Sequence, residues 1–457
     1  MGSNLTITLV NTAAAQRAFD RVLQTIQNNV TNVHTPGWAK QRVLLQAQPF
    51  STNWAGQQGG VRAGTLEDSR SQYAERSVRD SQSKLSYSSQ LSENLSRLEK
   101  TFDLNSGAAI PQAFTNLFNS FSQLSVSPNN PLPRQTVIDQ AKAVASSFND
   151  TSNGIASTRA EVDSQLNDTV STINSRLETI ARINAQKRAT PEAAGDPGVD
   201  AQMYAAIEEL SQYVRVQTLR QADGAVNVYL ADTTPLVTGD QALKLNYQPS
   251  STGVTIEDGY GRDVTSSVKD GALGGLVYQR NTLIPRYMDT LNTLAKDFAD
   301  RVNAIQQAGV TPAGTPPTSD IFTYNSTLGE AATLAVADTL TPDGIAAARA
   351  SAPGGNGNAL DFAALATDKS INNRSYTEEF GALAAQFGRD LSSARNNVNT
   401  ELSLLSQAKQ YREDLSGVDL NEAAAELIQF QRAYQASAEM FRILNQITET
   451  VLGLVRT

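Results

Sequence analysis

The sequence contains no cysteine and one histidine, His34, in 457 residues. Without cysteine the chain cannot form disulfides, thiolate nucleophiles or cysteine-ligated zinc sites. With one histidine it cannot build a metal site from two histidines of the same chain. Enzymes of this size ordinarily carry several of both residues, so their scarcity favours a structural protein. We expect no metal ion, no cofactor and no enzyme activity.

Long apolar runs are also missing. No stretch approaches the roughly 18 uninterrupted apolar residues that span a membrane, and the first residues lack the basic and apolar regions of a cleaved signal peptide. The formal net charge of −9 argues against nucleic acid, whose phosphates need lysine and arginine to displace counterions, and against an anionic membrane. We therefore expect neither partner, and a chain that stays in the cytoplasm or leaves it without a Sec signal.

The sequence does contain a heptad pattern at each end. Both patterns recur in steps of three and four over about four heptads or more, which predicts coiled-coil helices. The first comprises Leu5, Leu9, Thr12, Gln16, Phe19, Leu23, Ile26, Val30 and Val33. The second comprises Leu420, Ala423, Leu427, Phe430, Tyr434, Ser437, Phe441, Leu444, Thr448, Val451 and Val455. A break at Ser416-Gly417 precedes the second pattern, and Asp419 stands where an N-cap would.

The two terminal segments carry opposite charge. Residues 1–46 have a net charge of +3 and residues 413–457 a net charge of −4. Complementary charge and similar length predict that the two helices pair with each other. Each helix then has one partner within the chain, so its remaining apolar surface is left for neighbouring molecules.

Between the ends, further stripes predict long helices near residues 85–102, 134–188, 287–305 and 377–410, packed as a long antiparallel bundle. Alternating runs with glycine-containing turns predict a small β domain. The predicted fold is mainly α with β insertions, its terminal heptad helices paired as a coiled-coil rod. Four domains are expected: a terminal coiled-coil domain (1–62 with 413–457), a helical bundle (63–200 with 280–308 and 373–412), a small β domain (201–279) and an irregular insertion (309–372).

No catalytic or phosphate-binding motif accompanies these elements. The glycine-rich stretch from Pro353 to Ala359 follows an alanine-rich segment and indicates a loop. His34 has no Ser or Cys nucleophile beside it, so a surface or packing position is the simpler interpretation. The acidic pairs Glu208-Glu209 and Glu378-Glu379 lie on predicted helices and indicate solvated faces.

The N-terminal heptad pattern stops abruptly at Thr35-Pro36-Gly37-Trp38. Pro36 disfavours helix at Thr35, and Gly37 can adopt positive φ. We predict a hinge at these four residues, where the chain leaves the coiled coil, with Trp38 packed beside it. An ordinary helix-ending turn without a role in assembly is the alternative.

Four stretches of the sequence resemble one family. "NNVTNVHTPGW" (28–38) is similar to the Asn-Asn-x-x-Asn-x-x-Thr-Pro-Gly-Tyr signature of bacterial flagellar rod and hook proteins. "SGVDLNEAAAELIQFQRAYQASAEMF" (416–441) resembles the end of the flagellar hook-associated protein 1 family, FlgK. "GALGGLVYQR" (271–280) resembles that family's turn ahead of a returning helix, and "GGNGNALDFAAL" (354–365) resembles its Gly-Asp-Asn-x-Asn loop. Trp38, Ala39-Lys40 and Gly355 depart from the family pattern.

The resemblance implies a structural junction between flagellar hook and filament. It implies a helical tube with about eleven subunits per turn and the terminal helices inside. The hook protein and hook-associated protein 3 would be neighbours. The chain would be exported unfolded by the flagellar type III system, after a dedicated chaperone has bound its C-terminal helix, and would act outside the cell.

We expect the assembly interface to include ten apolar or aromatic side chains of the two heptad patterns. These are Leu9, Phe19, Leu23, Ile26, Val30, Leu427, Phe430, Tyr434, Phe441 and Leu444. The alternatives are a rod or hook protein, which shares Thr-Pro-Gly but normally enters β structure soon after it, and hook-associated protein 3. A coiled-coil adaptor explains the stripes but not a β insertion enclosed by complementary terminal helices.

Overall fold

A computed structural model describes residues 2–49, 59–103, 109–231 and 233–455 of the chain. It divides into two compact units. Unit 1 comprises residues 1–83, 173–244 and 401–457, and unit 2 comprises residues 84–172 and 245–400. The finer four-part division expected from the sequence remains a prediction.

Three long helices contribute residues to both units: α2 (Gln72–Leu98), α4 (Pro131–Ala189) and α11 (Tyr376–Ser416). The last two agree closely with the predicted spans. The helix α4 begins where the Asn130 side chain accepts a hydrogen bond from the Leu132 amide, 3.0 Å away, a normal N-cap contact. Its heptad positions are buried completely, as the periodicity required: Val137, Val144, Ile155, Val162, Leu166, Ile173, Leu177 and Ile180.

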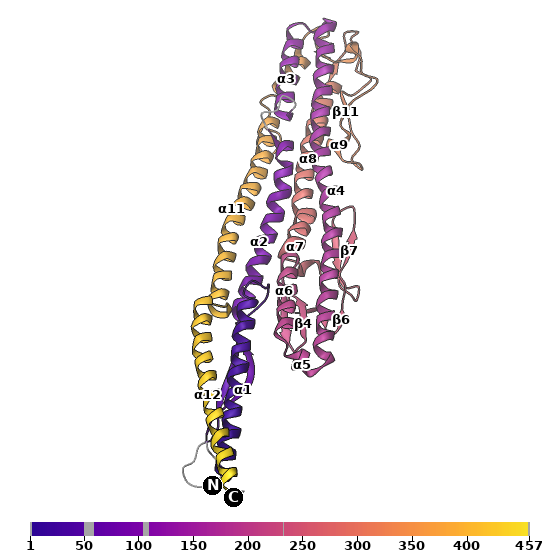
Figure 1. Ribbon diagram of the computed structural model, residues 1–457. Coiled ribbons are helices and arrows are strands. Elements are labelled where there is room, and N and C mark those ends of the chain that lie inside the picture. Colours follow the sequence, from indigo (N-terminus) through magenta and orange to yellow (C-terminus); the bar gives the residue numbers. More distant parts are fainter. Residues whose placement is uncertain (1, 50–58, 104–108, 232, 456–457) are drawn as a thin grey trace. The chain divides into compact units, whose positions relative to one another are not determined.

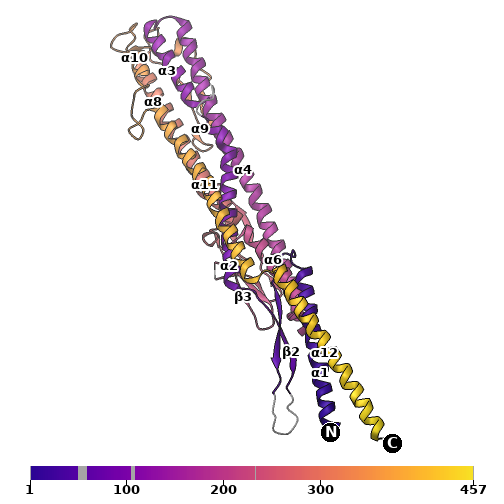
Figure 2. The ribbon, with the colours of Figure 1, turned by 60° about the vertical axis from the view of Figure 1, so that its left-hand side comes forward.

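Unit 1 contains both terminal helices. The helix α1 (Gly2–Thr31) lies beside α12 (Leu420–Val455), as both views show (Figure 1, Figure 2). The predicted N-cap of α12 is confirmed, because the Asp419 carboxylate accepts hydrogen bonds from the amides of Asn421 and Glu422 at 2.7 and 3.2 Å. Because α1 and α12 contact each other, the predicted pairing of the terminal helices is also confirmed.

A β-hairpin that the sequence analysis did not predict follows α1. Its strands β1 (Gln41–Ala47) and β2 (Val61–Asp68) pair antiparallel, with a register shift between Val43 and Leu45, and both contact α1. The strand β2 crosses the expected boundary at residue 63 between the terminal domain and the helical bundle. Alternation is weak here because only Val43 of β1 is a deeply buried apolar residue.

The remaining elements of unit 1 are two helices and a four-stranded antiparallel sheet in the order β3-β4-β5-β6. They are α5 (Pro191–Ala194), α6 (Pro197–Tyr213), β3 (Val216–Arg220), β4 (Val226–Leu230), β5 (Thr234–Thr238) and β6 (Gln241–Ala242). The strands β3 and β4 coincide with two of the alternating runs that predicted the β domain, whereas β5 and β6 were not predicted. Glycine takes the turns after β3 and β5, with Gly224 at φ +82° and Gly239 at φ +59°.

Unit 2 is built from helices around an aromatic core, with short two-stranded sheets. Its helices are α3 (Ile110–Val126), α7 (Gly271–Tyr278), α8 (Ile284–Ala308), α9 (Glu330–Thr333) and α10 (Gly357–Ala364). Short 3₁₀ or π turns are η1 (Glu99–Phe102), η2 (Thr265–Ser267), η3 (Gln279–Leu283) and η4 (Pro342–Gly344). Its strands are β7 (Asn246–Pro249), β8 (Val254–Glu257), β9 (Gly309–Val310), β10 (Phe322–Thr323), β11 (Ala335–Val336) and β12 (Ala348–Arg349).

The stretch 271–280 was expected to be a turn ahead of a returning helix. The structure instead makes it the helix α7, which continues through the π turn η3 into α8. Glycine is needed here because a Cβ at Gly275 would lie 3.0 Å from the Tyr87 carbonyl oxygen. Gly274 and Gly275 therefore permit α7 to pack closely on α2. This packing explains the two glycines without a turn.

Candidate assembly site

The terminal helices form the first part of the candidate site. Phe19 of α1 and Phe430 of α12 contact each other with ring centroids 6.2 Å apart, and Gln16 donates a hydrogen bond to the Tyr434 hydroxyl at 3.2 Å. Toward the turn after α1, a buried cluster joins both helices to the hairpin. It comprises Val22, Ile26, Val43, Val418 and Ala423, with Val33, Trp38, Ala63, Leu66, Leu427 and Phe430 packed against it.

The predicted interface residues do not all lie in this seam. Ile26 is buried, Val30 is exposed, and the rest are half-buried: Leu9, Phe19, Leu23, Leu427, Phe430, Tyr434, Phe441 and Leu444. In the second half of α1 the chain buries Val22 and Asn29 more deeply than the predicted Leu23 and Val30. At these two positions the deepest burial is displaced by one residue from the predicted pattern, whereas Thr12 and Ile26 of that pattern are themselves buried.

Other apolar side chains of α12 are between 41% and 56% exposed: Leu420, Ile428, Met440, Ile443, Ile447 and Val451. The last four follow one another in steps of three, four and four and form a short exposed stripe. Leu420 and Ile428 stand apart from it, since Gln431, Arg432 and Gln435 lie between Ile428 and Met440. An apolar stripe with steps of three and four on a helix is what a further helix would cover.

The second part of the site is the joint, residues 35–41, where the chain leaves α1. The Trp38 amide donates to the Thr35 carbonyl at 3.1 Å, and Gly37 has φ +75°. Pro36 and Gly37 thus occupy the central positions of a turn that requires positive φ at the second of them. A Cβ at Gly37 would lie 2.2 Å from the Ala201 carbonyl oxygen and 2.9 Å from the Ala205 amide nitrogen. The turn therefore rests directly on the backbone of α6.

Asn29 fixes the end of α1 to the start of β1. Its side chain accepts from the Gln41 amide at 2.9 Å and donates to the Gln41 carbonyl at 2.8 Å, as a paired strand would. The same oxygen accepts from the Trp38 indole nitrogen at 3.4 Å. Asn29 is only 3% exposed, so these bonds are the ones that satisfy its amide. Asn29 belongs to the Asn-Asn-x-x-Asn stretch, but its role was not predicted.

Arg70 holds the joint from the other side. Its guanidinium donates to the Gly37 carbonyl at 2.5 Å and to the Glu75 carboxylate at 2.6 Å, and lies 3.8 Å from the Tyr204 ring centroid. The side chains of Arg70 and Glu75 are 2% and 5% exposed. A charge-assisted pair at this depth is strong when complete and costly when one partner is removed.

The link between α11 and α12 meets the same joint. The Ser416 carbonyl accepts from the Lys40 amide at 2.8 Å, and its hydroxyl donates to the Ser69 carbonyl at 3.1 Å. Lys40 pairs with Glu422 of α12 at 2.7 Å. The joint is thus bonded on three sides in this structure, and the role of Thr35 to Trp38 as a hinge stays a prediction.

Arg412 of α11 completes the polar network. It donates to Glu208 at 2.6 Å and lies 3.5 Å from Glu75. Burial by itself would lower the pKa of the Arg412 guanidinium, but the carboxylates of Glu208 and Glu75 outweigh it and raise that pKa. The sequence gave no local signal for this network, because its members lie far apart along the chain and each resembles an ordinary surface charge.

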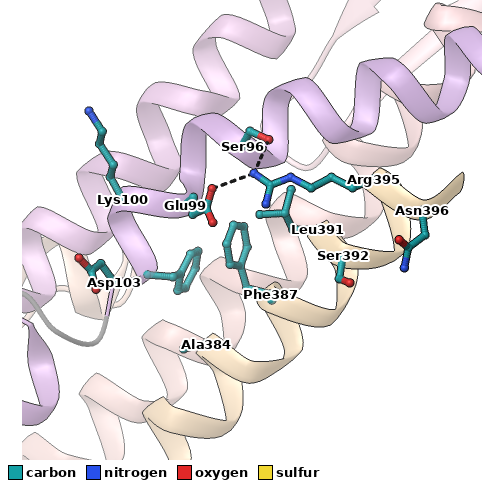
Figure 3. Close-up of a pocket in the computed structure, with 12 residues that line it drawn as sticks. Ser96, Glu99, Lys100, Asp103, Ala384, Phe387, Leu391, Ser392, Arg395 and Asn396 are labelled. Carbon is teal, nitrogen blue, oxygen red and sulfur yellow. Dashed lines mark hydrogen bonds and ion pairs between the residues drawn. The ribbon is translucent and has the colours of Figure 1, made fainter. Parts of the chain in front are cut away.

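Unit 2 contains a groove with a volume of about 750 Å³. Its lining includes the stacked rings of Phe102 and Phe387, whose centroids are 4.6 Å apart. Figure 3 shows Arg395 between Ser96 and Glu99, to which it donates at 3.2 and 2.9 Å. These contacts join α2 and η1 to α11, so the polar groups of the groove act in packing these elements together.

The described residues offer neither a metal site nor a membrane span. Across residues 2–49, 59–103, 109–231 and 233–455, His, Asp and Glu side chains nowhere gather in threes as a metal ion would require. Over the same residues, no helix is long and apolar enough to cross a bilayer.

Comparison with known proteins gives matches to two family models. Residues 95–322 match the model described as the flagellar hook-associated protein FlgK helical domain. Residues 410–454 match the model of the flagellar basal body rod FlgEFG protein C-terminal region. The second match covers most of α12 and the last turns of α11.

Curated relatives are similar over nearly the whole chain. Flagellar hook-associated protein 1 of Bacillus subtilis is 25% identical over 501 residues, covering 98% of this chain and 99% of that protein. The Escherichia coli protein of the same name is 22% identical over 551 residues with the same coverage.

The fold agrees with a solved structure, the flagellar hook junction protein FlgK from Burkholderia pseudomallei. That match has a TM-score of 0.66 at 18% identity and covers 74% of this chain and 99% of that one. Two flagellar family models in chain order, full-length relatives of one name and a shared fold converge on one assignment. The chain belongs to the flagellar hook-associated protein 1 (FlgK) family.

Proposed function

We propose that this chain forms the junction between flagellar hook and filament by helical self-assembly of its terminal helices. Membership of the family makes it a structural component of the flagellum rather than an enzyme. The observation that carries the mode of assembly is the exposed stripe on α12, from Met440 to Val451. One face of α12 is taken by α1, and the stripe offers a second face to another copy.

The terminal helices gain order from their neighbours in this proposal. A pair that leaves large aliphatic side chains half exposed buries too little surface to offset the entropy of ordering both helices. Packing in a tube supplies the missing burial. The family resemblance supports about eleven subunits per turn, neighbouring hook protein and hook-associated protein 3, type III export and a chaperone for the C-terminal helix.

Two experiments test the proposal. Deleting residues 420–457 should abolish motility and release filament monomers into the medium, whereas a coiled-coil adaptor predicts an unchanged flagellum. Limited proteolysis of monomer and assembled protein tests the coupling between order and assembly. A monomer whose first 33 residues resist protease as well as those of the assembled form would overturn the coupling.

The predicted anchors can be tested singly. Replacing Tyr434 by Ala should cost roughly 2–4 kcal/mol of assembly free energy if the ring is fully buried there. Incorporation of Tyr434→Ala into flagella, measured by immunoblot, checks this. Incorporation at the level of the unmodified chain would show that Tyr434 is no anchor.

A further inference from the structure

One face of α6 carries Asp200, Tyr204 and Glu208, which follow each other at intervals of four residues. Residues four apart lie one above the other on a helix, so these three side chains form a row. Asp200 and Tyr204 are 8% and 5% exposed, and the side chain of Glu208 is 21% exposed. Beside the row, the backbone of Ala201 and Ala205 lies against the turn of the joint. We call Asp200, Tyr204 and Glu208 the α6 row.

The first member of the row binds the end of α4 and the sheet. The Asp200 carboxylate accepts hydrogen bonds from the Lys187 ammonium and from the Arg220 guanidinium, the latter at 3.2 Å. Lys187 lies in the last turn of α4 with its side chain 0% exposed, and Arg220 ends β3. A charge buried this deeply is strongly destabilising without its partner. The order of Asp200 and Lys187 therefore depends on the sheet.

The middle member of the row joins this end to the joint. The Tyr204 ring centroid lies 3.8 Å from the Arg70 guanidinium, and its hydroxyl accepts from the Gln72 side chain at 2.7 Å. Burial by itself would lower the pKa of the Arg220 guanidinium, but Asp200 and the Tyr204 hydroxyl outweigh it and raise that pKa. Tyr204 thus interacts with one cation of the joint and one cation of the sheet.

The last member of the row closes the network on the other side of the joint. Glu208 accepts from Arg412 of α11 at 2.6 Å, and Arg412 lies 3.5 Å from Glu75. Glu75 is the carboxylate that binds Arg70, and Arg70 in turn donates to the Gly37 carbonyl. Hydrogen bonds in a medium of low dielectric constant strengthen one another. A continuous set of contacts thus runs from the sheet through the α6 row to the joint.

We propose that the α6 row couples the joint to the sheet of unit 1, so that order in either one stabilises order in the other. Tyr204 is a positioning residue in this coupling, since it interacts with Arg70 on the joint side and with Arg220 on the sheet side. A coupling free energy between two sites is reciprocal. The use of the coupling rests on the proposed function, because terminal helices that become ordered during assembly would transmit that order through the joint to β3 and β4.

Hydrogen exchange in the full-length monomer tests the coupling from its remote end. Lys187→Met removes the buried ammonium, whose hydrogen bond in this structure is to Asp200. Exchange of the Trp38 and Lys40 amides in the joint should become about fivefold faster or more, the lower end of typical coupling between two sites. The Phe121 amide in unit 2 should keep its exchange rate. Unchanged exchange at Trp38 and Lys40, or an equal change at Phe121, overturns the proposal.

Two further variants control for the loss of a buried charge. Lys244→Met is the matched control, because Lys244 pairs with Glu178 at 2.7 Å on the surface of the same unit and its side chain is 58% exposed. It should leave exchange in the joint unchanged. Arg220→Gln acts at the same end of the network as Lys187→Met, at a side chain 38% exposed, and should again speed exchange in the joint. It decides the question should Lys187→Met fail to fold.

Tyr204→Phe tests the link itself, because it keeps the ring beside Arg70 and removes the hydroxyl. In a double-mutant cycle, Lys187→Met should speed exchange in the joint of the unmodified chain and have a much smaller effect in Tyr204→Phe. An equal effect in both backgrounds overturns the role of Tyr204.

Assembled flagella separate this inference from the proposed function. The amides of β3 and β4 should exchange more slowly in the assembled protein than in the monomer, and this difference should shrink in Tyr204→Phe. If deletion of residues 420–457 leaves the flagellum unchanged, the proposed function fails while coupling in the monomer stands. If Lys187→Met and Arg220→Gln leave the joint unchanged while the deletion abolishes motility, only the coupling fails.

Discussion

The terminal pair α1–α12 in unit 1 and the aromatic core of unit 2 are both made of helices, yet they bury their rings differently. In unit 2, Phe114, Phe148, Phe298 and Tyr376 are fully buried, and the centroid of Phe114 lies 4.6 Å from that of Phe298. In the terminal pair, Phe19 and the facing aromatic residues are half-buried. Unit 2 completes its core within one chain, whereas the terminal pair has burial still to gain from a neighbour.

The size of that gain follows from the exposed apolar side chains of α12. Burying one Ile, Leu or Met side chain fully contributes about 1.5–3 kcal/mol, and α12 has five such side chains and one valine at 41–56% exposure. Even a partial gain at each is comparable with the stability of a whole domain, about 5–15 kcal/mol. The difference between the regions is therefore a difference in where the stability resides: within the chain or between chains.

The largest expected effect is in the aromatic core. Phe298→Ala removes a ring that contacts Phe114, Phe322 and Tyr376, and should destabilise unit 2 by roughly 3–5 kcal/mol. Hydrogen exchange of α8 amides in the monomer measures this locally. The control Leu328→Ala, at a side chain 70% exposed, should change exchange little. Unchanged protection of α8 in Phe298→Ala would contradict a core completed within one chain.

The next effect is at the joint. Gly37→Ala puts a methyl group against the Ala201 carbonyl at positive φ, which should cost roughly 2–3 kcal/mol from strain and displacement of α6. Gly261→Ala is a matched control, because Gly261 also has φ +75° but nothing within 4 Å of its Cβ position. Amide exchange around each site should show the larger loss at Gly37. Equal losses would mean that φ strain alone matters and that the contact with α6 is loose.

The elements that could be predicted from sequence are those in which periodicity repeats. The helix α4 and the pairing of α1 with α12 follow from many apolar positions in register, so single errors cancel. The hairpin β1–β2 could not be predicted, because it is short and half exposed. The positions of Arg70 and Glu75 were missed for another reason: their burial depends on α6 and α11, which are distant in sequence. Asn29 is buried in place of the predicted Val30 because its side-chain amide forms the two hydrogen bonds that a paired strand would form with Gln41. A heptad pattern counts Asn as polar and so does not mark this position as buried.

A smaller effect distinguishes the two faces of α12. Phe430→Ala removes a half-buried ring from the pair α1–α12 and should cost the monomer about 1–2 kcal/mol. Ile428→Ala, at a side chain of α12 that is 52% exposed, should leave the monomer within about 0.5 kcal/mol of the unmodified chain but weaken assembly. Thermal unfolding of monomers and incorporation into flagella measure the two quantities. Equal costs of both substitutions in the monomer would remove the distinction between an inner and an outer face.

The smallest expected change, and one of opposite sign, is at Arg79 of α2. Arg79 is 6% exposed, and its one hydrogen bond, to the Thr218 hydroxyl, is 3.3 Å long, while Nε and Nη1 lack a partner among the described residues. Burial lowers the pKa of its guanidinium, and Glu75, which opposes this, is already bonded to Arg70. A buried charge with so little compensation adds little stability. Arg79→Met should therefore leave unit 1 unchanged or stabilise it by up to about 1–2 kcal/mol.

The exposed Arg76 on the same helix is the control for this substitution, because its pair with Asp80 is 3.8 Å long and its side chain is 54% exposed. Arg76→Met should change stability by less than about 0.5 kcal/mol. Urea unfolding followed by far-ultraviolet circular dichroism compares the two variants. A loss above about 1 kcal/mol in Arg79→Met alone would show that the guanidinium is compensated after all. The stability of unit 1 would then depend on its buried charged side chains, as the stability of unit 2 depends on its aromatic rings.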